Sequence, residues 1–466
     1  MKKTVALILA FIMIIMSGAV ASADYKKLSR SEWDEIYNKY HYDNTLPLIN
    51  VGADETEISL CWHADNSNAK AEVLVAKNAD MNDSVLFEGE ITASEKDEQV
   101  VCRVTVKGLE ANTTYYYQWN TGDGWSDSYE YSTKSFGDHK ALVIGDIQIS
   151  EDTRTEGELQ PDTGFNWNNT LVEALNKNPD VSYLVSPGDN TSTGSTAEEW
   201  ATFLMPEAVR GLPMALAIGN HDKKGVMYEY YTNMPNQYAG KHFRGIDKDF
   251  WFRYGDVLYL VFNSTSGNAP DHMAMAKEAV EKNPDAKWRI GMVHHGIYGA
   301  GDAIGDTETE LLLTTIFAPI FETMDLDFVI TGHTHSQGRS HFMENGKIVG
   351  TAEGGKTYIN PEGIVYLNSN SVCEPVVMDY EAYHLAYSFM ENDVTTYSTL
   401  EFKGNQLILE TRRGDNSELL DSLVIEKDIE FKENSFGNFI KRLLYKVVEF
   451  VGLIYVKIDY LSKGIS

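Results

Sequence analysis

Five stretches between residues 140 and 335 decide the fold, and each joins an apolar run to polar residues. They read ALVIGDIQ at 141–148, YLVSPGDN at 183–190, MALAIGNHD at 214–222, RIGMVHH at 289–295 and FVITGHTH at 328–335. A short apolar run flanked by glycine or polar residues is typical of a buried strand. In sheets built from βαβ units, ligand-binding residues gather beyond the carboxyl ends of the strands. The five stretches therefore predict that Asp, Asn and His side chains meet at one rim.

The segments between these runs have the spacing of helices. Residues 165–177 and 197–209 carry helical spacing, and strong helix formers dominate 273–282. Each segment lies between two of the five runs, where a crossover helix is expected.

The runs after His335 return to a β-like pattern. They lie around Ile348 and at 363–367, 395–402 and 406–410. We expect them to form the second sheet of an αββα sandwich. The fold class predicted for residues 137–430 is therefore α/β.

Residues 24–136 have the texture of an all-β domain. Short alternating runs occur at 57–62, 71–75 and 101–106. Several strands at such spacing predict a β-sandwich. Leu109, followed by two threonines and Tyr115, resembles the tyrosine corner of fibronectin type III-like domains. That resemblance implies that the Tyr115 hydroxyl satisfies backbone across the corner, which is a structural role.

The first 23 residues have the pattern of a secretory signal peptide. Lys2 and Lys3 precede an uncharged apolar run at 5–16, and Ala-Ser-Ala follows at 21–23. A retained membrane anchor is the alternative, but the apolar run is short for a span. We therefore expect a secreted or otherwise extracytoplasmic protein.

Residues 431–466 have the pattern of an amphipathic tail. Charged residues such as Arg442 and Lys446 fall on one side of a helix, and apolar residues such as Leu443 and Val447 fall on the other. The longest uncharged run has seven residues, too few to span a bilayer. A helix docked on its own domain and an interfacial helix in peripheral contact with a membrane both fit this pattern.

The composition excludes some functions. Asp and Glu number 69 against 39 Lys and Arg, which gives a net charge of −30. Broad nucleic-acid binding needs a basic surface, so we expect no nucleic-acid partner. Hydrophobic residues make up 43% of the 466, enough for a substantial core. Anionic substrates would need local positive charge, which bound metals can supply.

Three cysteines are too few for a disulfide scaffold. Cys61 alternates with residues of the predicted core face, whereas Cys102 is in phase with Val104 and Val106. The two side chains are therefore expected on opposite faces of their strands, which disfavours a bridge.

The donor set at the five strand ends indicates metals. Carboxylate, amide and imidazole together suit a pair of hard or borderline cations better than a thiolate site would. Each motif alone is a weak signal, because Gly-Asp and His-x-His pairs occur by chance. The ordered set of five is far more specific.

The set resembles the calcineurin-like metallophosphoesterases, and with the β-sandwich in front it is most similar to the purple acid phosphatase branch. The resemblance implies two divalent or trivalent metal ions, of iron, manganese or zinc. Ligands to the first metal would be Asp146 and His335, with Gln148 as a candidate neutral ligand. Ligands to the second would be Asn220, His294 and His333, and Asp189 would bridge both.

Four further residues receive roles from their places beside these motifs. His221 is the candidate to stabilise the transition state or protonate the leaving oxygen. Asp222 would orient His221, or would cap a helix or turn. Arg339 would contact substrate phosphate, or would be a surface arginine. His295 is expected on the substrate side or behind the ligands, not on a metal.

The sequence departs from the resembled families in two places. Ser192 stands where purple acid phosphatases carry the tyrosine that binds ferric iron, and Gln148 stands where many relatives carry histidine. We therefore expect no ferric-tyrosinate colour. Ala303 and Ile304 replace a histidine pair of the plant-type enzymes, so substrate handling must differ.

The function favoured by these observations is an exported, dinuclear metal-dependent phosphatase. It would hydrolyse small phosphate esters by attack of a hydroxide that bridges the metals. One alternative is a phosphodiesterase or nucleotide hydrolase that uses the same metals. Another is a non-catalytic cell-surface binding protein in which the β-sandwich does the binding.

Overall fold

The computed structural model describes residues 25–428, with short gaps. The gaps are 42, 44, 66–67, 95–98, 151–162, 241–247, 300–306, 374, 377–381, 390 and 392–393. The predicted signal peptide at 1–23 and the predicted tail at 431–466 lie outside these residues. Within them, no helix is both long and apolar enough to cross a bilayer.

The largest sheet of the described chain has eleven strands, and its centre holds three of the motif strands. These are β9 (His139–Val143), β10 (Val181–Ser186) and β11 (Met214–Leu216), which run parallel. Beside β9 the sheet continues through β22 (Thr396–Lys403), β23 (Gln406–Arg413), β24 (Leu419–Glu426) and β19 (Lys356–Ile359). Beyond β11 it continues through β1 (Leu48–Val51), β2 (Glu57–Asp65), β6 (Gln99–Lys107) and β5 (Glu90–Ala93).

A second sheet of seven strands faces the first. Its parallel strands are β13 (Val257–Phe262), β14 (Trp288–Val293), β15 (Phe328–Thr331) and β20 (Val365–Asn368). Its antiparallel strands are β12 (Phe250–Tyr254), β16 (Gly338–Ser340) and β21 (Leu385–Ser388). The hydroxyls of Tyr183 and Tyr259 meet at 3.2 Å between the sheets, and apolar side chains of both share one core.

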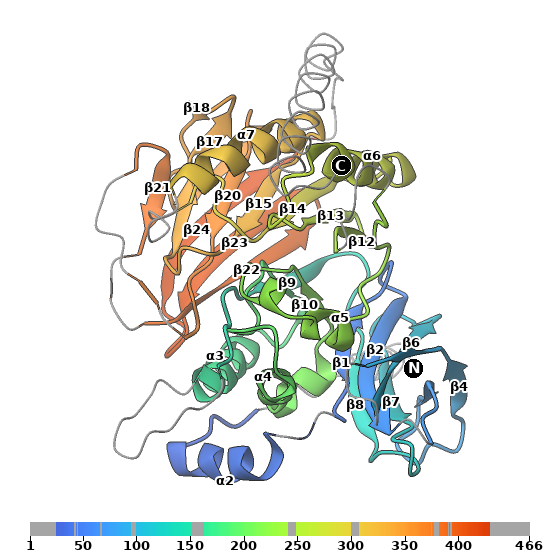
Figure 1. The fold of residues 1–466 in the computed structure, drawn as a ribbon. Coiled ribbons are helices and arrows are strands. Elements are labelled where there is room, and N and C mark those ends of the chain that lie inside the picture. The colour runs from blue at the N-terminus through green and yellow to red at the C-terminus, as the bar shows by residue number, and fades with distance from the viewer. Residues whose placement is uncertain are drawn as a thin grey trace, which may run out of the picture.

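Helices cover the outer faces of the two sheets (Figure 1). On one side lie α3 (Thr163–Lys177), α4 (Ala197–Leu204) and α5 (Met227–Tyr231), with 3-10 turns η1 (Glu207–Gly211) and η2 (Asp222–Lys224). On the other side lie α6 (Ala269–Lys282) and α7 (Thr307–Thr323). This layering confirms the predicted α/β fold of the αββα type.

The predicted membership of the second sheet was partly wrong. The run at 363–367 does join it as β20, next to β15. The runs at 395–402 and 406–410 instead became β22 and β23 of the first sheet, with β22 antiparallel to β9. The run around Ile348 forms β18 (Lys347–Gly350), paired only with β17 (Phe342–Glu344) among the described strands. Alternation predicts that a run is a strand but does not predict which strand it pairs with. β22 pairs with β9 and so covers an edge of β9 that would otherwise be open.

Of the range 24–136 that was predicted to be all β, residues 48–132 are all β. A four-stranded sheet of β4 (Val85–Glu88), β3 (Glu72–Ala76), β7 (Thr114–Trp119) and β8 (Tyr129–Ser132) packs on β1, β2 and β6. The Glu110 amide donates to the Tyr115 hydroxyl at 2.8 Å, which confirms the tyrosine corner. The first residues of that range instead form a helix, α2 (Arg30–Tyr40), which packs Trp33 against Gly164 and Met205.

The cysteines lie on opposite faces, as expected, and all three are free thiols. Cys102 packs in the sandwich core with Trp62. Cys61 faces the other way, yet it is also buried, because α5 covers that side of β2 and the Tyr230 carbonyl accepts from its thiol at 3.3 Å.

Candidate metal centre

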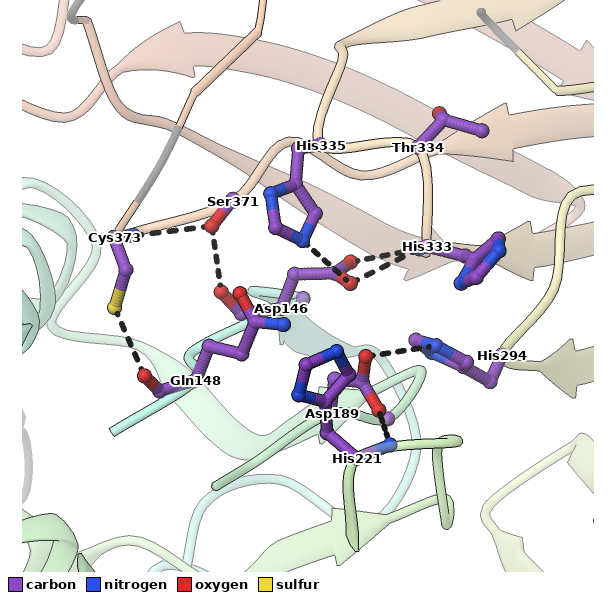
Figure 2. Close-up of polar contacts among 12 residues, drawn as sticks. Asp146, Gln148, Asp189, His221, His294, His333, Thr334, His335, Ser371 and Cys373 are labelled. Atoms are coloured by element: carbon purple, nitrogen blue, oxygen red, sulfur yellow. Dashed lines mark hydrogen bonds and ion pairs between the residues drawn. The ribbon is translucent and has the colours of Figure 1, made fainter. Parts of the chain in front are cut away.

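The predicted ligands meet where the carboxyl ends of both sheets come together (Figure 2). Asp146, Asp189 and Asn220 follow β9, β10 and β11 of the eleven-stranded sheet. His294 follows β14, and His333 and His335 follow β15 of the seven-stranded sheet. The rim expected from one sheet is thus built by two sheets that face each other.

Five residues of the centre have left-handed backbone conformations. Their φ angles are 45° at Asp146, 47° at Gln148, 50° at Asp189, 72° at His333 and 54° at His335. A residue with a Cβ pays roughly 1–3 kcal/mol for such a conformation, which persists only where the surroundings impose it. Concentration of this strain at one place is typical of a functional site.

One group of donors forms around Asp146. Its carboxylate lies 3.7 Å from Nε2 of His335, and both of its oxygens accept from the His333 amide at 3.0 Å. Figure 2 shows the Gln148 side-chain amide directed toward the same centre. These residues are the predicted ligands of the first metal.

A second group forms around His294. Its Nε2 lies 2.9 Å from Oδ1 of Asn220 and 3.1 Å from Oδ2 of Asp189. Donor atoms of Asp189, His294 and His333 all lie within 4.8 Å of one another. The other Asp189 oxygen accepts from the His221 amide at 2.7 Å, which holds the carboxylate between the two groups.

Two motif glycines allow the carboxylates to approach the backbone. A Cβ on Gly219 would lie 2.0 Å from Oδ1 of Asp189, and a Cβ on Gly332 would lie 2.3 Å from Oδ2 of Asp146. Any side chain at these positions would displace a ligand, which explains the glycine in both motifs.

The electrostatics of the centre favour bound cations. Burial raises the pKa of the Asp146 carboxyl to about 8, since the charged form is poorly solvated there. Burial would also raise the pKa of Asp189, but His294 holds it below its ordinary value. Against the effect of its own burial, His294 has its pKa raised to about 9 by Asp189. Two buried carboxylates with oxygen and imidazole donors around them fit two hard or borderline cations.

The His221 ring is held by the Ser192 carbonyl and not by Asp222, the residue predicted to orient it. Its Nδ1 lies 2.6 Å from the Ser192 carbonyl, to which it donates, and Nζ of Lys224 lies 3.0 Å from the same nitrogen. Asp222 instead accepts from the amides of Gly219 and Thr191, both at 3.0 Å. Asp222 therefore joins the loops after β10 and β11, as in the alternative that it caps a turn.

His295 lies beside the second donor group. Its backbone amide and its Nδ1 both contact Oγ of Ser264, at 3.2 and 2.7 Å. Its ring centroid is 4.5 Å from that of His333. Burial, with His294 and His333 nearby, lowers the pKa of His295 well below its ordinary value. This neutral ring packs behind the ligands, and its predicted contact with substrate stays a prediction.

The prediction for Arg339 was wrong in both of its forms. The side chain is fully buried, and its guanidinium donates to both carboxylate oxygens of Asp421, at 2.6 and 3.0 Å, and to the Ala352 carbonyl at 2.7 Å. Because β16 and β24 belong to different sheets, this ion pair ties the sheets together. A guanidinium so engaged has no place in phosphate binding.

Ser192 fills the position of the tyrosine found in purple acid phosphatases. Its hydroxyl donates to the Gln148 carbonyl at 2.9 Å, and its own carbonyl holds His221. It therefore serves the backbone of the centre and offers no phenolate. Ala303 and Ile304 lie outside the described residues.

Sequence reasoning missed three residues that touch the centre. Ser264 contacts His295, and Ser371 and Cys373 contact the backbone of the Asp146 loop. Ser371 and Cys373 follow the buried strand β20, so the strand-end rule that found the ligands could also have found them.

Two family models match this chain. The one described as calcineurin-like phosphoesterase matches residues 139–337. The one described as purple acid phosphatase, N-terminal domain, matches residues 47–133. The first range contains every predicted metal ligand, and the second is the all-β part.

Individual relatives agree with these matches. Purple acid phosphatase 1 of Ipomoea batatas is 27% identical over 256 residues, which are 52% of this chain and 52% of the relative. The chain thus spans about half the length of that curated relative.

Solved structures show the same fold. The purple acid phosphatase PPD1 from yellow lupin (Lupinus luteus) seeds superposes with a TM-score of 0.65 at 15% identity, over 82% of this chain and 74% of that one. The structure of PhoD superposes with a TM-score of 0.55 at 10% identity, over 90% and 99%. At these identities the likeness concerns the fold alone.

Proposed function

Because the chain joins a purple acid phosphatase N-terminal domain to a calcineurin-like phosphoesterase domain, we propose that it is a metal-dependent phosphatase acting on phosphate esters. The observation that supports this most is the meeting of Asp189, His294 and His333, which come from three strands and two sheets. Asp146 and His335 lie beside them in the same buried centre.

The resident cofactor in this proposal is a pair of ions from iron, zinc and manganese. Asp146, Gln148 and His335 would hold one ion, and Asn220, His294 and His333 the other, with Asp189 shared. When bound, such a pair makes a water acidic enough to be a nucleophile at neutral pH and neutralises charge on the phosphoryl group.

The chain's own contribution to proton transfer would come from His221. Because Nδ1 is bonded to the Ser192 carbonyl, Nε2 is the nitrogen left to face a substrate. Figure 2 shows the ring beside Asp189 and Gln148, within the group of ligands. When the ring carries a second proton on Nε2, that nitrogen can pass it to the departing ester oxygen and leave the neutral ring with Nδ1–H still donating to Ser192.

Three further parts of the proposal concern the whole chain. The signal-peptide pattern supports export, and the tail at 431–466 supports peripheral contact with a membrane surface. We place domain boundaries at 24–136 and 137–430. The net charge of −30 favours small phosphate esters over nucleic acids as substrates.

The test is metal analysis of the purified protein together with a panel of phosphate monoesters and diesters. We expect two metal equivalents, hydrolysis of a monoester, and loss of both in Asp189→Asn. Faster hydrolysis of diesters or nucleotides would support the phosphodiesterase alternative. A metal-loaded protein that cleaves no ester, and whose ligand binding is unchanged in Asp189→Ala, would support the cell-surface binding protein.

A further inference from the structure

A short segment after β20 fastens the backbone of the loop that carries Asp146. Oγ of Ser369 accepts from the Gly145 amide at 3.0 Å. Oγ of Ser371 donates to the Asp146 carbonyl at 2.9 Å, and the Val372 amide donates to the same oxygen at 3.2 Å. Three residues within four positions thus hold the turn at which the first donor group begins.

The thiol of Cys373 extends this grip to the next ligand. Its Sγ contacts the Ile147 carbonyl and lies 3.5 Å from the Gln148 carbonyl (Figure 2). The Cys373 amide in turn donates to Oγ of Ser371 at 3.1 Å, so that hydroxyl both accepts and donates within the segment.

The same segment also reaches the strand end that carries His335. The Ser369 amide donates to the Thr331 carbonyl at 2.8 Å, and the Val376 amide donates to the His335 carbonyl at 2.7 Å. The segment therefore bridges the ends of β9 and β15, which belong to different sheets. It links the two strand ends whose side chains form the first donor group.

These bonds fall on backbone that needs support. Asp146, Gln148 and His335 all have positive φ angles, and each receives a bond from the segment at its carbonyl oxygen. A strained conformation persists when the surroundings determine it. In the second donor group, Asn220 and His294 follow β11 and β14, which are not the strands whose ends the segment bridges.

We propose that Ser371 and Cys373 are positioning residues for the metal site formed by Asp146, Gln148 and His335. They set the affinity of that site through the backbone and do not touch the ion. This inference rests on the proposed metal-dependent function. Groups that orient ligands typically change metal affinity 10- to 100-fold when removed, which is the size of effect we expect here.

The experiment titrates the full chain with Mn²⁺ and, separately, with Zn²⁺. Wild type is expected to bind two ions. In Ser371→Ala and Cys373→Ala, one binding step is expected to weaken about 10- to 100-fold and the other to change little. Cys373→Ser keeps a donor at the same place and should recover most of the affinity.

Matched controls come from buried side chains elsewhere in the chain. Ser398→Ala removes a hydroxyl that bonds Thr411 on β22 and β23, and Cys61→Ala removes a thiol that bonds the Tyr230 carbonyl. Both should leave the two binding steps as in wild type. Thermal unfolding of each metal-free variant shows whether it is folded during titration.

Alkylation of the thiols gives a second readout that does not depend on activity. If the segment and the first metal stabilise the same conformation, Mn²⁺ must slow alkylation of Cys373 by reciprocity. Alkylation of Cys61 and Cys102 should be unaffected, since Cys102 packs in the sandwich core and Cys61 is buried under α5.

Three results would overturn the inference. One is unchanged binding of both ions in Ser371→Ala and Cys373→Ala, and another is equal weakening of both steps. The third is alkylation of Cys373 at the same rate with and without Mn²⁺. A wild-type protein that binds no metal and cleaves no ester would instead overturn the proposed function itself.

Discussion

Two parts of the eleven-stranded sheet end their strands differently: the parallel part, β9–β11, and the antiparallel part, β1–β2–β6–β5. β9, β10 and β11 are parallel, so their carboxyl ends lie on one side. β1, β2, β6 and β5 are antiparallel, so their ends alternate between sides. Of these two parts, only the parallel one can gather ligands from consecutive strands, and the buried, left-handed Asp146 and Asp189 follow its strands.

The comparison teaches that chemistry and stability are supplied by different parts of one sheet. The parallel part carries backbone strain and buried charge, both of which work against folding unless cations are bound. The antiparallel part carries a regular apolar core, and a satisfied tyrosine corner joins its β6 to β7 of the four-stranded sheet. Substitutions should therefore separate into those that remove metal and activity and those that lower the free energy of unfolding.

The largest effect is expected from a substitution in the parallel part, at Asp189. Asp189→Asn keeps an acceptor for the His221 amide but removes the charge shared by both donor groups. Because ligands of a metal pair act as a unit, we expect activity to fall by at least about a thousandfold. Metal content measured on the same samples should fall with it.

The matched control for Asp189→Asn is Asp421→Asn, which alters a buried carboxylate that is paired with Arg339 and not with a predicted ligand. It should lower stability and leave the metal content of the folded protein unchanged. Metal content that fell equally in both variants would break the separation between the two kinds of residue.

The next effect concerns the ion pair that ties the two sheets. Arg339→Met leaves the carboxylate of Asp421 buried without its partner, and such losses typically cost about 3–5 kcal/mol. Chemical denaturation would measure this change in the free energy of unfolding. If Arg339 contacted phosphate, the variant would instead raise KM at unchanged stability.

The sequence predicted which candidate ligand side chains would come together, because that signal is local. Each of Asp146, Asp189, His294 and His333 directly follows an apolar run or its glycine, so the strand-end rule needs no knowledge of neighbours. The tyrosine corner at Tyr115 was found for the same reason, since its partner Glu110 is five residues away.

What the sequence did not predict depends on partners far along the chain. Arg339 pairs with Asp421, which lies 82 residues later, and nothing around either residue indicates the other. The His221 ring found the Ser192 carbonyl in place of the adjacent Asp222. β22 joined β9 across more than 250 residues. Such pairings are decided by packing of the whole fold, so local pattern leaves them open.

A smaller effect is expected from pH on the free energy of unfolding, through a histidine at the start of β9 in the parallel part. Burial lowers the pKa of His139 to about 4, although its Nδ1 bonds the Gly137 carbonyl and Asp138 and Asp256 favour its charged form. The unfolded chain therefore takes up the proton first, near its ordinary pKa of about 6.5. Stability is lost as pH falls below about 6.5 and levels off near 4, a difference of about 3 kcal/mol.

The measurement is the free energy of unfolding against pH for wild type and His139→Phe. The variant should lose less stability over this window, because phenylalanine takes up no proton. Equal slopes for the two proteins would show that other groups cause the loss. Metal should be removed by chelation beforehand, so that ligand protonation does not add to the slope.

The smallest effect is expected at the tyrosine corner, where the chain passes from β6 of the antiparallel part to β7 of the four-stranded sheet. Tyr115→Phe removes the hydroxyl that accepts from the Glu110 amide at 2.8 Å, and a hydrogen bond of this kind contributes about 1 kcal/mol. Metal binding and the pH dependence of activity should match wild type, since no predicted ligand follows a strand of the antiparallel part or of the four-stranded sheet. Thermal unfolding detects the stability change, and metal titration serves as the test of separation. A Tyr115→Phe protein with weakened metal binding would mean that the sandwich affects the metal centre through the paired strands β1 and β11. The parallel and antiparallel parts of the sheet would then be coupled.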